Sequence, residues 1–189
     1  MKKSLTVAFM LIPIWAKPVG ALSQDGKSFV YRYIQEMLIP KPSILSLEDF
    51  LEAVAQSESN NNYSCVNKLG YLGKYQFSKV LLRDLGIKVS KEEFISNPKI
   101  QEFAMRKLLY HNKHILRKEI AMFDGKEVNG VFVTESGILA AAHLGGPKSV
   151  KLFLYKGVNK KDAMGTKVSS YMKKFSGYRL DISKDVLYF

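Results

Sequence analysis

The stretch TESGILAAAHLGGP, residues 134–147, determines how the rest of the chain must pack. Thr134 or Ser136 is a suitable N-cap, and the residues that follow, to His143, predict an unusually apolar helix. Because leucine and alanine occur on all faces of this helix, we expect it to be buried at the centre of a domain. The Gly-Gly-Pro at its end predicts a break, with a further helix over residues 148–155.

The segments on either side of this stretch predict further helices and little strand. A capping box at Ser46 opens a helix over residues 46–58, with apolar residues at helical spacing. The other predicted segments are helices over 75–85 and 97–124, a short helix capped at Ser90, a helix over 166–175, and a β-hairpin or extended link over 128–133. We therefore predict the mainly α class, as a single helical domain with at most a small β-hairpin.

Length and composition limit the classes of protein that this chain can belong to. Its 189 residues suffice for one domain with a core of its own and are too few for two. No uninterrupted run of 18 apolar residues occurs, which excludes a polytopic membrane protein. The net charge of +12 favours an anionic partner: nucleic acid, a membrane surface or an acidic polymer of the cell envelope.

The first 21 residues have the layout of a secretory signal peptide. Two lysines precede an apolar run over residues 5–16, and small residues suited to cleavage lead up to Ala21. An uncleaved membrane anchor is the alternative interpretation. With cleavage, the mature chain is 22–189, periplasmic or secreted, without stable insertion in the membrane. Export argues against nucleic acid as the partner and favours the cell wall.

Glu58 is the first candidate for a chemical role. It lies at the C-terminal end of the predicted helix 46–58, and no Asp or Glu follows it until Asp84. The loop after it contains Gly70-Tyr-Leu-Gly-Lys-Tyr-Gln-Phe77, whose glycines allow a ligand to approach the backbone and whose tyrosines can stack on sugar rings. On position alone, an ordinary surface acid remains the alternative.

Four short motifs in this order resemble the lysozyme-like superfamily, and within it the soluble lytic transglycosylases and the goose-type lysozymes. The residues that carry the resemblance are Gln56-Ser-Glu-Ser-Asn60, Gly73-Lys-Tyr-Gln-Phe77, Ala142-His-Leu-Gly-Gly-Pro147 and Tyr171. Two positions depart from the family pattern: Lys74-Tyr75 stands where those families have Leu-Met, and His143-Leu144 stands near their Tyr-Asn pair. Together the motifs span residues 46–176.

The resemblance implies an α+β lysozyme-like domain over residues 22–189 that acts on peptidoglycan glycan strands. Glu58 would be the single acid and base of a lytic transglycosylase, which breaks the MurNAc–GlcNAc β-1,4 bond and leaves 1,6-anhydromuramyl ends. The implied substrate-binding residues are Gly73, Tyr75, Gln76, His143 and Tyr171. A goose-type-like muramidase that hydrolyses the same bond is one alternative. A non-catalytic wall-binding or secretion-apparatus protein with the same fold is the other.

The remaining reactive side chains indicate structural roles. His143, on a predicted buried helix, is also a candidate for a packing role. His111 and His114 lie three residues apart and give no metal-site spacing, so we expect neither a metal nor another cofactor. Cys65 is the single cysteine and cannot form a disulfide within the chain.

Overall fold

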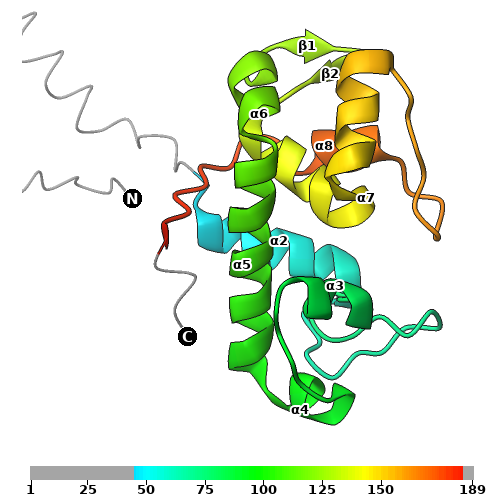
Figure 1. Cartoon of the computed structure of the whole chain (residues 1–189). Helices are drawn as coiled ribbons and strands as arrows, with labels where there is room; N and C mark the ends of the chain where they lie inside the picture. The colour runs from blue at the N-terminus through cyan, green and yellow to red at the C-terminus, as the bar shows by residue number, and fades with distance from the viewer. Residues whose placement is uncertain (1–44, 185–189) are drawn as a thin grey trace, which may run out of the picture. The chain divides into compact units, whose positions relative to one another are not determined.

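The computed structural model describes residues 45–184 (Figure 1). The expected signal peptide and the start of the mature chain lie outside these residues. The described helices and strands are α2 (Leu47–Ser59), α3 (Lys79–Asp84), α4 (Lys91–Ser96), α5 (Pro98–Ile115), α6 (Arg117–Phe123), β1 (Glu127–Val128), β2 (Val131–Phe132), α7 (Glu135–Lys156) and α8 (Val168–Lys174). β1 and β2 form an antiparallel pair. The prediction of a mainly α fold with a small hairpin is therefore confirmed.

Helix α2 begins where its sequence signals predict. The Ser46 side chain accepts a hydrogen bond from the backbone N–H of Asp49, whose carboxylate accepts from the backbone N–H of Ser46 in return. This is a complete capping box. The helix ends at Asn60, which adopts a left-handed conformation with φ of 53°. The buried face of α2 consists of Phe50, Leu51, Val54 and Ala55.

Helix α3 begins four residues later than predicted, at Lys79 instead of Tyr75. The backbone groups of Leu72 and Phe77 bond each other in both directions at 2.8 Å, which closes a tight loop and holds the intervening residues out of a helix. Ser78 then caps α3 by accepting from the N–H of Leu81. Apolar spacing alone did not reveal this competing loop.

The predicted helix over 97–124 is two helices, α5 and α6, separated at Leu116. Leu116 is fully buried, with φ of −100° and ψ of 13°. Its side chain belongs to a different apolar cluster from the buried face of α5. The change of direction at Leu116 thus lets α6 reach the second cluster.

Helix α7 packs in both apolar clusters, as its all-round apolar sequence predicts. Leu139 and Ala140 belong to the cluster with α2, α3, α4 and α5, whereas Ile138 and Ala141 belong to the cluster with the hairpin and α8. The predicted break occurs at Gly146, whose φ of 75° and ψ of 162° interrupt the helix. The segments before and after the break are thus separate helical pieces.

Figure 1 shows α5 and α6 following each other along most of the described unit. α3 and α4 lie at one end of α5, and α6, the hairpin, α7 and α8 lie toward the other, with α2 crossing between them. No helix within 45–184 combines the length and the apolar character that a membrane crossing needs.

Candidate active site

A cleft lies at the C-terminal end of α2. Its volume is about 190 Å³, below the roughly 300–1,000 Å³ typical of pockets that enclose a whole small molecule. Such a size fits a groove that holds one part of a longer ligand. The residues that line it are Glu58, Asn67, Tyr71, Gln76, Ser78, Leu81, His143, Leu144, Asp162, Ala163 and Met164.

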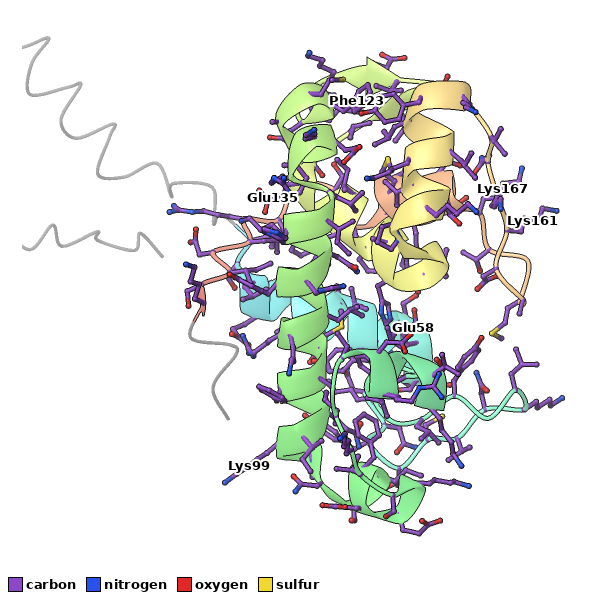
Figure 2. All side chains as sticks on the ribbon, in the orientation of Figure 1. Glu58, Lys99, Phe123, Glu135, Lys161 and Lys167 are labelled. Atoms are coloured by element: carbon purple, nitrogen blue, oxygen red, sulfur yellow. The ribbon has the colours of Figure 1, made fainter. Side chains whose placement is uncertain are left out.

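Glu58 is one of the two carboxylates that line this cleft. Figure 2 shows it at the end of α2, between the segment that contains α3 and the helices α7 and α8. Its side chain is 17% exposed. The hydroxyl of Tyr171 donates a hydrogen bond to Oε1 of Glu58. Among the described residues no hydrogen bond to Oε2 is seen, so this second oxygen is the one open to a ligand.

Tyr171 is held in place by packing from α8. The residue is 6% exposed, and its ring packs against that of Phe175 with centroids 4.9 Å apart. Burial raises the pKa of the Tyr171 hydroxyl, and the charge of Glu58 and the hydrogen bond to it raise that pKa further. The hydroxyl therefore keeps its proton near neutral pH and serves Glu58 as a donor.

His143 comes to the same carboxylate from α7. Its Nε2 lies 3.8 Å from Oε1 of Glu58, beyond hydrogen-bond distance, and its side chain is 5% exposed. Burial lowers the pKa of His143 below the usual 6.5, although the charge of Glu58 and the backbone of Tyr75 act in the opposite direction. The imidazole is accordingly neutral near pH 7. It contacts the edge of Phe77 as well, which places it in the core and at the cleft.

Gln76 enters the cleft from the loop before α3. Its backbone is left-handed, with φ of 52°, a conformation that a non-glycine residue rarely adopts. Its side-chain Nε2 donates to the carbonyl of Gly73 at 2.8 Å, whereas its buried Oε1 accepts no hydrogen bond in the described structure. Backbone strain of this kind is typical of functional sites.

Gly73 and Tyr75, which the resemblance assigns to the substrate, are buried and do not line the cleft. With φ of 75° at Gly73, an added Cβ would lie 2.1 Å from Oε1 of Gln101. That oxygen accepts the backbone N–H of Lys74, while Nε2 of Gln101 donates to the carbonyls of Tyr63 and Phe94. Gly73 is thus required for the loop to pack on α5. Neither residue lines the cleft, and their role in substrate binding stays a prediction.

The Lys-Tyr pair that departs from the family pattern forms an ionic network with Glu102 of α5. Nζ of Lys74 lies 2.9 Å from Oε1 of Glu102. The same oxygen accepts from Tyr63 at 2.7 Å, and Oε2 accepts from Tyr75 at 2.8 Å. Burial alone would raise the pKa of Glu102, but these donors hold it below its usual value. The network braces the loop that carries Gln76.

Asp162 is a carboxylate that lines the cleft and that the sequence did not single out. It lies 104 positions after Glu58 in the chain, on the loop between α7 and α8. Its charge also contributes to the raised pKa of Tyr171, which places it near the Glu58–Tyr171 pair. No local motif marks it, because only the folding of the chain brings this loop to the cleft.

No family model, curated protein or solved structure matches this chain. The site must therefore be judged on its own geometry. Within residues 45–184, no three His, Cys, Asp or Glu side chains gather closely enough to bind a metal ion. The arrangement that is present, a carboxylate held on one oxygen by a phenol and open on the other, is suited to proton transfer with a ligand in the cleft.

Proposed function

We propose that this chain is a lytic transglycosylase that cleaves the MurNAc–GlcNAc bond of peptidoglycan with Glu58 as its single acid and base. The observation that carries the proposal is the hydrogen bond from Tyr171 to Glu58, whose side chain lines the cleft. The identity of the substrate rests on the resemblance to the lysozyme-like families. The four motifs occur in the same order as in those families, and they include the glutamate and the tyrosine.

In the first step Glu58 donates a proton to the glycosidic oxygen. The bond between C1 of the muramyl residue and that oxygen breaks, and the GlcNAc residue leaves with the proton as a hydroxyl. Negative charge develops on Glu58 during this step. The hydrogen bond from Tyr171 strengthens as that charge forms, so it stabilises the transition state more than the ground state.

In the second step the Glu58 carboxylate accepts the proton of the muramyl 6-hydroxyl. The oxygen of that hydroxyl bonds to C1 and closes the 1,6-anhydro ring, which returns Glu58 to its protonated form. Because the attacking hydroxyl is on the same sugar as C1, its effective concentration is high, and no second carboxylate is needed to activate water.

The partner and location follow from the same proposal. The substrate is the glycan strand of peptidoglycan, an anionic polymer that suits the basic chain. The expected signal peptide, residues 1–21, would deliver the mature protein to the periplasm or the exterior.

Hydrolysis of the same bond is the second candidate, and Asp162 favours it. A hydrolase of the inverting or retaining kind uses two carboxylates, and Asp162 lines the same cleft as Glu58. The two reactions differ in their products, since hydrolysis adds water and leaves reducing muramyl ends.

Digestion of purified peptidoglycan by the mature protein tests both candidates. We expect mass spectrometry to show 1,6-anhydromuramyl ends, which are lighter by one water than hydrolytic ends. Glu58→Gln should lower turnover by about 10²–10⁴-fold, as loss of a general acid does. Glu52→Gln is the matched control, because Glu52 lies on the same helix with its side chain 65% exposed and outside the cleft. Full activity of Glu58→Gln would refute the assignment.

A further inference from the structure

The loop between α7 and α8 is fixed by interactions that use only one oxygen of Asp162. Oδ1 of Asp162 accepts the backbone N–H groups of Met164 at 3.0 Å and Thr166 at 2.7 Å. The backbone N–H of Asp162 donates to the carbonyl of Thr166 at 2.9 Å. Lys161 and Lys167, on the two arms of the loop in Figure 2, pair as an antiparallel bridge. The carboxylate is therefore anchored through Oδ1.

The other oxygen of this carboxylate has no assigned role within the protein. Among the described residues no hydrogen bond is seen to Oδ2 of Asp162, and Asp162, Ala163 and Met164 form one wall of the cleft. An ionised carboxylate oxygen is a strong hydrogen-bond acceptor, and its bonds to neutral donors are charge-assisted. The cleft that Glu58 lines thus also contains a carboxylate with an oxygen left to accept a hydrogen bond.

Other residues that line the cleft offer polar atoms of complementary character. Oδ1 of Asn67 is occupied by the backbone N–H groups of Leu69 and Tyr71, at 2.9 and 3.0 Å. The NH₂ group of the Asn67 side chain therefore remains available as a donor to a ligand, and Tyr71 lines the same cleft. A donor, an aromatic residue and an acceptor that line one cleft match a sugar ring, which has hydroxyl groups on its edge and an apolar face.

We propose that Asp162 binds a sugar residue of the glycan strand, as the hydrogen-bond acceptor for a hydroxyl or acetamido N–H group. This inference rests on the proposed function, since it takes the ligand of the cleft to be a glycan. It assigns Asp162 to substrate binding and leaves the proton transfers to Glu58. A second carboxylate in the cleft then does not make the protein a hydrolase.

The substitution Asp162→Asn separates ligand binding from loop structure. Asn retains an oxygen that accepts from Met164 and Thr166, so the loop keeps its conformation, while the free acceptor becomes an NH₂ donor. Losing a hydrogen bond to a charged group weakens binding by roughly 10- to 100-fold. We expect KM on soluble glycan strands to rise by that factor with kcat changed by less than about twofold.

Binding of chitotetraose by calorimetry, in the Glu58→Gln background, gives the second readout. Adding Asp162→Asn should weaken the affinity by the same factor, and adding Asp84→Asn, at an aspartate that is 63% exposed and outside the cleft, should not change it. Unchanged KM and affinity in Asp162→Asn would overturn the inference while leaving the role of Glu58 intact. A second result would also overturn the inference: a lower kcat in Asp162→Asn together with a change of product, from reducing ends in the wild type to anhydro ends in the variant. Asp162 would then be the base that activates water. Full activity of Glu58→Gln would instead refute the proposed function.

Discussion

Replacing Gly73 by alanine tests whether this glycine serves packing or substrate contact. Gly73 and Gly70 both have left-handed backbones, with φ of 75° and 79°. Alanine in that conformation costs about 1–2 kcal/mol at either position. At Gly70 nothing lies within 4 Å of the added Cβ, so this cost is the whole effect.

At Gly73 the added Cβ would lie 2.1 Å from Oε1 and 2.6 Å from Cδ of Gln101, so Gln101 must move. Its movement breaks at least the buried bond from the backbone N–H of Lys74, and an unsatisfied buried donor costs about 1–3 kcal/mol. We therefore expect Gly73→Ala to lower the free energy of unfolding by about 2–5 kcal/mol, and Gly70→Ala by about 1–2 kcal/mol.

Urea unfolding of the two variants beside the wild type measures this difference. The midpoints should fall in the order wild type, Gly70→Ala, Gly73→Ala, with similar slopes if the transition remains two-state. Equal midpoints for the two variants would refute the packing argument. Native stability of Gly73→Ala together with lost glycan binding would instead indicate that Gly73 contacts the substrate.

Two further predictions concern the side chains around Glu58. Tyr171→Phe keeps the ring that packs on Phe175 but removes the donor to Glu58, so we expect kcat for peptidoglycan to fall by roughly 10- to 100-fold with KM little changed; wild-type kcat would contradict this. The pKa of His143 is lower in the folded state than in the unfolded state, so protons bind the unfolded state more tightly. The free energy of unfolding that this histidine contributes above pH 6.5 is therefore lost as the pH falls through the folded-state pKa. Urea unfolding at pH 8 and pH 5 should show that the free energy of unfolding falls less in His143→Gln than in the wild type. The control His114→Gln, at an exposed histidine, should lose as much as the wild type. Equal losses in all three proteins would contradict the burial argument.

The helix that carries Glu58 could be predicted from the sequence because its signals are local. The capping box at Ser46 and the apolar spacing of α2 are complete within 13 residues. The same holds for the hairpin and for the break at Gly146, where glycine and proline mark the chain directly. Each of these elements matched its expected place to within a few residues.

The boundaries that failed depend on contacts that are distant in sequence or hidden by apolar spacing. The pairing of Leu72 with Phe77 excludes the first turn predicted for α3, although these residues continue its apolar pattern. The break at Leu116 has no glycine or proline and follows from the two apolar clusters that α5 and α6 enter. Asp162 and Glu102 were missed for the same reason, since tertiary packing alone places them beside the residues they serve.

The network around Glu102 restricts the mutations that this chain can accept one at a time. The Lys74 side chain is 11% exposed and that of Glu102 is 28% exposed, so an unpaired charge is more costly at Lys74. If Lys74 is exchanged for the leucine of the resembled families first, the intermediate keeps an unpaired Glu102, whereas loss of Glu102 first leaves the more costly unpaired Lys74. The two positions are epistatic: the effect of one substitution changes with the state of the other. Evolutionary paths to this network are expected to acquire the glutamate first and the lysine second.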